Sequence, residues 1–166
     1  FALGELAITR LAQGDAQAAL GLLQKYIGLR EGNAWGLAHL GRAYELLGDD
    51  DSAAFNYRAA LEADSRLAIA YHWLGLLLSR KGQSQASQEA IEEYDRLRGL
   101  LNAEQQLNMA LLRKTDDVHS LLRLAKVQFE LGKTREALAT LERAHQLAPS
   151  HLEVQALRRR WRNNQQ

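Results

Sequence analysis

Apolar residues recur along most of the chain with the period of an α-helix. One stretch carries four apolar or small positions spaced i, i+3, i+4, i+7: Leu37, Leu40, Gly41 and Tyr44. A short polar segment follows, and then a second series begins: Ala53, Tyr57, Ala60 and Leu61. This spacing places each series on one face of a helix. The pattern therefore predicts two helices, joined by a turn, that pack their apolar faces together.

The polar segment between these two helices has the residues that end one helix and begin the next. Gly48 fits the position after a helix where the backbone turns left-handed, at little cost for glycine. Asp49, with the two aspartates after it, supplies an N-cap and a favourable charge for the second helix. Gly41 and Ala53 are small, so the two helices can approach closely. A larger side chain at either position should cost about 1–3 kcal/mol.

The same order of residues returns along the chain. Four glycines mark it, at spacings of 34, 34 and 50 residues: Gly14, Gly48, Gly82 and Gly132. Eight residues before each stands a leucine: Leu6, Leu40, Leu74 and Leu124. Pro149 closes the last repeat. A fixed period of this length predicts a stack of helical hairpins, each burying its apolar face against its neighbours.

The third repeat is irregular, because it is 16 residues longer than the 34 of the first two. Its apolar series keeps a nearly helical phase: Ala90, Ile91, Tyr94, Leu97, Leu101, Leu107 and Leu111. We therefore expect one long helix over 86–113, with Gly99 as its weak point. The alternative is a break near Asn102, where the letters NAEQ resemble a capping box.

These repeats resemble the tetratricopeptide repeat family, most closely in the second and in the fourth (LAKVQFELGKTREALATLERAHQLAP). The resemblance implies an all-α fold, a right-handed superhelical solenoid of antiparallel helix hairpins in a single domain. Its repeats would be 1–33, 34–67, 68–117 with the irregular insertion, and 118–150. A capping helix over 151–162 would turn Leu152, Ala156 and Leu157 inward and its arginines outward. The apolar start of the chain suggests the C-terminal part of a longer protein.

Composition fits a folded helical chain, with 46% hydrophobic residues, 25% charged residues and a single proline. The net charge of +1 provides no general attraction for nucleic acid. Cysteine is absent, which excludes disulfides and thiolate chemistry and leaves the compartment unknown, compatible with cytoplasm or bacterial periplasm. No apolar run approaches the roughly 18 residues of a membrane span.

Catalytic signatures are also absent from the sequence. It contains no GxGxxG, GxxxxGK, GxSxG or HExxH string, and no cysteine nucleophile. The five histidines are dispersed, and His145 and His151 stand on either side of Pro149 rather than on one helical face. We therefore expect no enzyme, no cofactor, no metal site and no small-molecule substrate.

In the family that the chain resembles, the first helices of the hairpins line a concave groove that holds peptides or partner helices. The positions so placed include Ala38 and Leu122, and eight more that we select as partner-binding residues: Trp35, His39, Arg42, His72, Trp73, His119, Arg123 and Lys126. Tryptophan and arginine dominate many interfaces, so this surface suits a partner with apolar anchors and some negative charge. The alternative for the tryptophans is packing against the next repeat.

The resemblance also allows one known use of the family to be tested. Its co-chaperone members grip a C-terminal carboxylate with lysine, asparagine and arginine side chains. The matching positions are Gly4, Ile8, His39, Ile69 and Trp73, or, one repeat later, Ala38, Arg42, Trp73, His119 and Arg123. Neither set makes a full clamp, which argues against binding of chaperone tails.

The sequence thus predicts a non-catalytic protein–protein interaction scaffold that binds a peptide segment or partner helix in its concave groove. Two alternatives remain. One is nucleic-acid binding through the last helix, which carries Trp161 and four arginines: Arg158, Arg159, Arg160 and Arg162. The other is self-association into a homo-oligomer through the exposed N-terminal helix.

Overall fold

A computed structural model describes residues 2–29 and 32–163, and Phe1 and the last three residues lie outside this range. Within the described residues the secondary structure consists of nine α-helices joined by short turns. In chain order they are α1 (Ala2–Ala12), α2 (Ala16–Gly28), α3 (Ala34–Leu46), α4 (Asp50–Ala63), α5 (Ala68–Arg80), α6 (Ser84–Arg113), α7 (Val118–Glu130), α8 (Thr134–Leu147) and α9 (Leu152–Asn163). The predicted all-α fold is confirmed.

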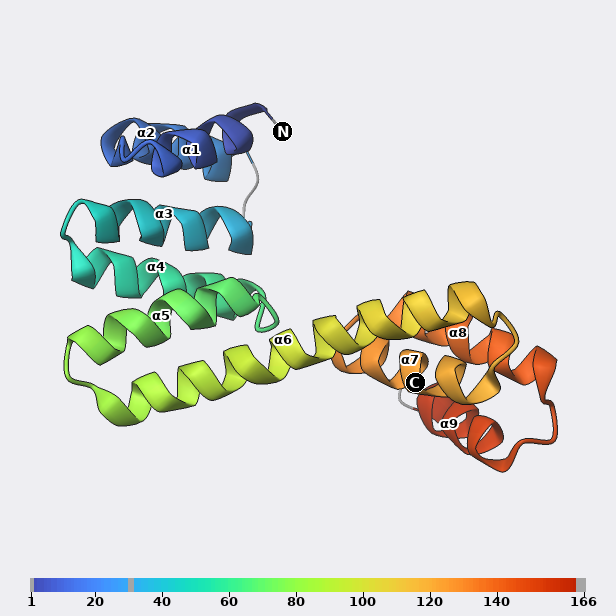
Figure 1. Ribbon diagram of the computed structural model, residues 1–166. Helices are drawn as coiled ribbons and strands as arrows, with labels where there is room; N and C mark the ends of the chain where they lie inside the picture. The colour runs from blue at the N-terminus through green and yellow to red at the C-terminus, as the bar shows by residue number, and fades with distance from the viewer. Residues whose placement is uncertain (1, 30–31, 164–166) are drawn as a thin grey trace. The chain divides into compact units, whose positions relative to one another are not determined.

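The helices form two compact units, residues 1–96 and 97–166, which we call the N-terminal and the C-terminal unit. The N-terminal unit contains the hairpins α1/α2 and α3/α4, and then α5 with the first part of α6 (Figure 1). The C-terminal unit contains the rest of α6, the hairpin α7/α8 and then α9. Sequential hairpins are the arrangement that the repeat predicts.

The turns have the predicted chemistry. Each of the four repeat glycines has a positive φ, which is 84° at Gly48. Only glycine adopts this backbone conformation without strain, so each can end its helix abruptly. After Gly48, the Asp49 carboxylate accepts a hydrogen bond from the backbone N–H of Ser52 at 3.0 Å, which caps α4.

Small residues bring the paired helices into close contact. Ala53, Tyr57 and Ala60 of α4 are fully buried. A Cβ atom added to Gly41 would lie 2.7 Å from the Tyr57 ring and 3.0 Å from the carbonyl oxygen of Ala53. The predicted close approach of α3 and α4 is therefore confirmed, and Gly41 leaves the space that the Tyr57 ring fills.

The irregular third repeat contains one continuous helix, because α6 runs without interruption for 30 residues. The long-helix prediction is confirmed, and the break near Asn102 is not observed. Ala90, Leu97, Leu107 and Leu111 are buried along this helix, whereas the side chain of Leu101 is 43% exposed. The apolar series therefore has the helical phase expected of it, but not all of its members are covered.

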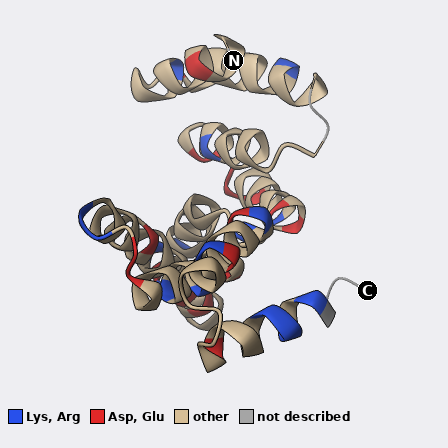
Figure 2. Ribbon diagram, turned by 90° about the vertical axis from the view of Figure 1, so that its right-hand side faces the viewer, with Lys and Arg blue, Asp and Glu red and all other residues tan. Residues whose placement is uncertain are grey.

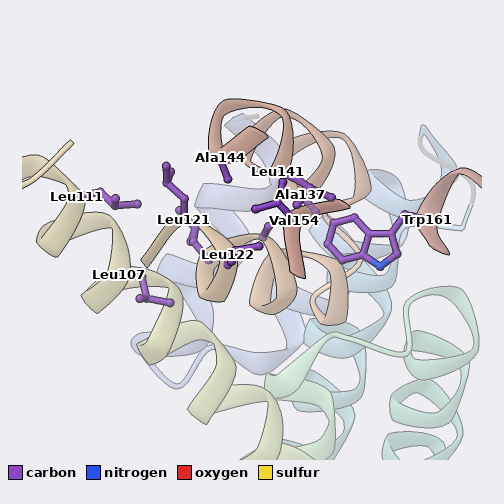
Figure 3. Close-up of a cluster of buried hydrophobic side chains, with 11 residues drawn as sticks. Leu107, Leu111, Leu121, Leu122, Ala137, Leu141, Ala144, Val154 and Trp161 are labelled. Atoms are coloured by element: carbon purple, nitrogen blue, oxygen red, sulfur yellow. The ribbon is translucent and has the colours of Figure 1, made fainter. Parts of the chain in front are cut away.

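The core of the C-terminal unit corrects the prediction for the last helix (Figure 3). Val154 and Trp161 of α9 are buried, and the Trp161 ring stacks on Phe129 at 4.5 Å between centroids. Leu152, expected inward, is 82% exposed, Ala156 is exposed and Leu157 is half-buried. The inward face of α9 therefore consists of Val154, Leu157 and Trp161. Leu152 is left on the opposite face, and the large indole of Trp161 packs in the core. Its burial also keeps Trp161 from stacking on a nucleobase.

Candidate partner-binding site

Five aromatic rings of the N-terminal unit follow one another in a continuous row, which we call the aromatic row. It consists of Tyr26, Trp35, His39, Trp73 and Tyr57. The centroid distances between successive rings are 5.6, 4.0, 5.1 and 5.9 Å. The rings come from α2, α3, α5 and α4, so the row joins all three hairpins of the unit. Trp35, His39 and Trp73 are each half-buried, so these three residues keep some contact with solvent, whereas Tyr57 is fully buried.

His39 lies at the centre of the row and is held in one tautomer. Its Nδ1 atom lies 2.9 Å from the carbonyl oxygen of Trp35. A carbonyl oxygen can only accept, so Nδ1 carries the proton and Nε2 is the acceptor of the neutral ring. Burial lowers the pKa of His39 and outweighs the opposing effect of the Trp35 hydrogen bond. At neutral pH the row therefore contains no charged ring.

A small cavity of about 270 Å³ opens at the Trp35 end of the row. It is lined by Gly4, Glu5, Ile8, Tyr26 and Trp35, from α1, α2 and α3. Apolar surface and two aromatic rings make up most of this lining, with the Glu5 carboxylate as its charged group. Such a cavity suits one apolar or aromatic side chain of a ligand.

Arg42, at the other end of α3, is held in an ion-pair network. Its guanidinium lies 2.8 Å from Glu45, whose side chain is only 5% exposed. Glu45 also accepts hydrogen bonds from the Tyr57 hydroxyl at 2.5 Å and from Arg80 at 2.7 Å. Burial acts to raise the pKa of Glu45, but the hydrogen bonds from Tyr57, Arg80 and Arg42 outweigh it and hold the pKa below its ordinary value. The charge of Arg42 is therefore already compensated within the protein.

His72, the remaining selected residue of the N-terminal unit, is half-buried against the ring of Tyr94, with 4.7 Å between centroids. Its Nδ1 atom is buried without a hydrogen-bond partner. This histidine belongs to the contact between α5 and α6 rather than to the aromatic row.

Three selected residues belong to the C-terminal unit, on α7: His119, Arg123 and Lys126. His119 and Arg123 are exposed. Lys126 donates a hydrogen bond to Glu153 of α9 at 2.6 Å, which lowers the pKa of that carboxyl. The structure thus places His39 in contact with both Trp35 and Trp73, and the α7 residues form a separate group.

Several features of the site escaped the sequence analysis. Tyr26 and Tyr57 belong to the second helices of their hairpins, so a search along the first helices could not find them. Ala38 and Leu122, expected in the groove, are buried at 0% and 2% exposure. Ala38 clusters with Ala60 and Ala70, and Leu122 lies in the core of the C-terminal unit. Both occupy contacts between helices, and in each case the next residue, His39 or Arg123, is the more exposed.

A wider cleft of about 610 Å³, also not predicted, lies between α6 and α8 in the C-terminal unit. Its apolar walls include the exposed side chains of Met109 and Leu112. Gln128, on its floor, accepts a hydrogen bond from the Thr140 hydroxyl at 2.8 Å. The apolar series of the third repeat keeps its helical phase past the part of α6 that pairs with α5. This continuation is the sequence signal that could have indicated a second apolar surface on α6, where the cleft lies.

Comparison with known proteins identifies the family. Family models of the tetratricopeptide repeat match residues 36–66, 68–99 and 119–151. The chain belongs to the tetratricopeptide repeat family. Domains of tetratricopeptide repeats are generally protein-interaction modules and are typically non-catalytic. A search of curated proteins finds no significant match.

Solved structures of tetratricopeptide proteins share the fold. MamA is 20% identical, with 87% of this chain and 75% of MamA covered at a TM-score of 0.52. The Sgt2 tetratricopeptide domain from Aspergillus fumigatus is 22% identical, with 58% of this chain and 64% of that domain covered at 0.56. A thermophilic tetratricopeptide protein of Thermus thermophilus is 21% identical, with coverages of 93% and 77% at 0.53.

Length and apolar character decide whether a helix of this tetratricopeptide chain could span a membrane. Across residues 2–29 and 32–163, none is both long and apolar enough to cross a bilayer. In the same residues no group of three or more histidine, aspartate or glutamate side chains is arranged to hold a metal ion.

Proposed function

We propose that the face formed by α1, α3 and α5 binds a segment of a partner protein, either an extended peptide or a helix, and that Trp35, His39 and Trp73 of the aromatic row form the centre of this binding face. The observation that supports the proposal is the continuous contact of Trp35, His39 and Trp73, each half-buried. These three helices lie next to one another in the N-terminal unit. Partly exposed tryptophans on a rigid support are typical of residues that dominate binding energy.

The chemistry of this face favours apolar anchors in the partner. His39 is neutral, and the charge of Arg42 is compensated by Glu45. A ligand therefore gains mainly from covering the indole rings of Trp35 and Trp73. The cavity beside Trp35 would take one side chain of the ligand, and the Nε2 atom of His39 would accept one hydrogen bond from it.

A peptide-selection experiment tests the proposal. Twelve-residue peptides would be selected from a random display library on the native domain, and their affinities would be measured by fluorescence anisotropy. The double variant Trp35→Ala, Trp73→Ala should bind the selected peptides at least tenfold more weakly. Phe55→Ala is a matched control, because Phe55 is 70% exposed on α4 and lies outside the row.

Circular dichroism of the variants separates binding from packing. If the double variant keeps its helicity but binds as tightly as the native domain, the tryptophans serve only the contact between repeats, and the proposal is wrong. An equal loss with Phe55→Ala would assign the peptides to a nonspecific aromatic contact and would also reject it. Loss confined to the double variant would support the binding face.

A further inference from the structure

We propose that the C-terminal unit carries a second binding site, an oxyanion pocket between α8 and α9 that takes a carboxylate or phosphate group of an acidic protein segment. This site shares no residue with the aromatic row, and none of its residues was selected as a partner-binding residue from the sequence. It lies wholly within one compact unit.

A cavity of about 240 Å³ defines the pocket. Its lining residues are His145 of α8 and four residues of α9: Gln155, Arg158, Arg159 and Arg162. All five carry hydrogen-bond donors, and the lining includes no acidic side chain. Figure 2 shows the last turns of α9, beside the C-terminus, coloured as basic residues. A concave site walled by guanidinium groups favours an anion, because arginine binds carboxylate and phosphate with two parallel hydrogen bonds.

The positive charge of the pocket is only partly compensated. Arg158 pairs with Glu142 of α8 at 2.9 Å, and its side chain is 23% exposed. Arg159 and Arg162 have no carboxylate partner among the residues that the structure describes. Glu142 therefore holds one guanidinium at the edge of the pocket and leaves two others available for a ligand.

His145 adds a donor of fixed direction. Its Nδ1 atom is buried without a hydrogen-bond partner. A proton on this nitrogen would be a buried, unsatisfied N–H group, which proteins strongly avoid. The neutral ring therefore carries its proton on Nε2. The N–H donor that His145 can offer to a ligand is this Nε2–H group. Gln155 is held by a hydrogen bond from its amide to the carbonyl oxygen of Pro149 at 2.9 Å, which orients this wall of the pocket.

The same region favours a protein segment over nucleic acid. Binding of single strands combines basic groups with aromatic faces on which bases stack. Here the aromatic residue of α9, Trp161, is 5% exposed and stacked on Phe129. The charge of the whole chain is only +1, so a long polyanion meets little net attraction from the chain as a whole. A single pocket suits one acidic side chain, and a domain of tetratricopeptide repeats generally binds proteins.

Arg160 provides a matched control on the same helix. It is exposed, as Arg159 and Arg162 are, but it lines a different cavity, together with Phe129 and Trp161. The test variant is Arg159→Gln with Arg162→Gln, and the control is Arg160→Gln. Glutamine keeps most of the side-chain stem and removes the charge, so all variants should retain the native circular dichroism spectrum.

The experiment measures binding of four fluorescein-labelled probes by anisotropy at two salt concentrations. The probes are a hexaglutamate peptide, a peptide of the same length with two phosphoserines, a hexaglutamine peptide and a 20-nucleotide single-stranded DNA. We expect one or both acidic peptides to bind, hexaglutamine not to bind, and the test variant to weaken binding at least tenfold. The Arg160→Gln control should stay within twofold of the native protein. Preference between the two acidic peptides then identifies carboxylate or phosphate as the ligand group.

Other results would overturn the proposal. Equal weakening by Arg160→Gln would show a general charge effect of α9 instead of a pocket. DNA binding tighter than that of both peptides would assign the helix to nucleic acid, and no binding of either acidic peptide would leave the pocket without its ligand class. The variant Trp35→Ala, Trp73→Ala should bind the acidic probes like the native domain, so failure of the aromatic row and failure of this pocket remain distinguishable.

Discussion

Glycine at the contact of two helices determines how closely they pack, and the structure provides a pair of glycines with opposite surroundings. An added Cβ at Gly41 would lie 2.7 Å from the fully buried Tyr57 ring. At Gly21, inside α2, an added Cβ meets nothing within 4 Å. The same chemical change should therefore have opposite effects at the two positions.

We predict that Gly41→Ala lowers the free energy of unfolding by about 1–3 kcal/mol, because the backbone of α4 and the Tyr57 ring must move. Gly21→Ala should raise it by about 0.5–1 kcal/mol, since alanine is the better helix former. Urea denaturation followed by circular dichroism measures both. Stabilisation of similar size at the two positions would show that helix propensity, rather than the contact with Tyr57, controls Gly41.

These residue-scale features are the part of the fold that the sequence predicted best. The roles of Gly41, Gly48 and Asp49 each depend on a local requirement: a close approach, a positive φ or a free N–H group at a helix start. Such requirements admit few residue types, so the residues reveal them. The aromatic row has no comparable local signature, because Tyr26 reaches Trp35 and Trp73 reaches His39 only after three hairpins have packed.

At the scale of elements, one buried carboxylate joins three helices. Glu45 of α3 accepts hydrogen bonds from Tyr57 of α4 and Arg80 of α5. Because its pKa is lowered in the folded state, the folded protein binds fewer protons at this site than the unfolded chain. Its contribution to stability is therefore fully present above the ordinary pKa of 4.5 and is lost as the pH falls through the folded-state value.

We predict that Glu45→Gln lowers the free energy of unfolding by about 2 kcal/mol at pH 7, through loss of charged hydrogen bonds in a buried place. The difference from the native protein should shrink as the pH is lowered from 7 to 3, because below the ordinary pKa of 4.5 the unfolded chain takes up a proton that the folded protein does not yet bind at this site. Glu62→Gln is the control, since Glu62 is exposed on α4. Thermal unfolding at several pH values measures the effect, and a difference that stays constant with pH would contradict it.

Helices were predicted more reliably than the faces that they present. The phase of the apolar series indicated that α6 is continuous, but in α9 the predicted inward set (Leu152, Ala156 and Leu157) differs from the observed one (Val154, Leu157 and Trp161). Burial of Trp161 decides between them, since a ring stacked on Phe129 contributes more covered area than Leu152. That choice depends on a partner 32 residues earlier in the chain, which no local pattern contains.

At the scale of the whole molecule, α6 is the element that both compact units share. Gly99 lies close to the boundary at residues 96 and 97, is exposed, and would meet nothing within 4 Å if it carried a Cβ. Proline at this position would remove one backbone hydrogen bond and clash with the preceding turn, at a cost of about 3 kcal/mol or more. In a linear array of repeats, each repeat is stabilised only by its own folding and by its contacts with its immediate neighbours.

We therefore predict that Gly99→Pro uncouples the unfolding of the two units, whereas Gly99→Ala preserves or strengthens their coupling. Leu23→Ala, which opens a cavity in the N-terminal unit where Leu23 is fully buried, would serve as the perturbation. Hydrogen exchange of α7 and α8 should become faster when Leu23→Ala is added to Gly99→Ala. In this background the two units unfold together, so opening of the N-terminal unit also exposes backbone amides of the C-terminal unit. Added to Gly99→Pro, the same cavity should change exchange only within the N-terminal unit, where Leu23 packs against α1 and α3. If α7 and α8 respond equally in both backgrounds, the units are not coupled through the helical backbone at Gly99.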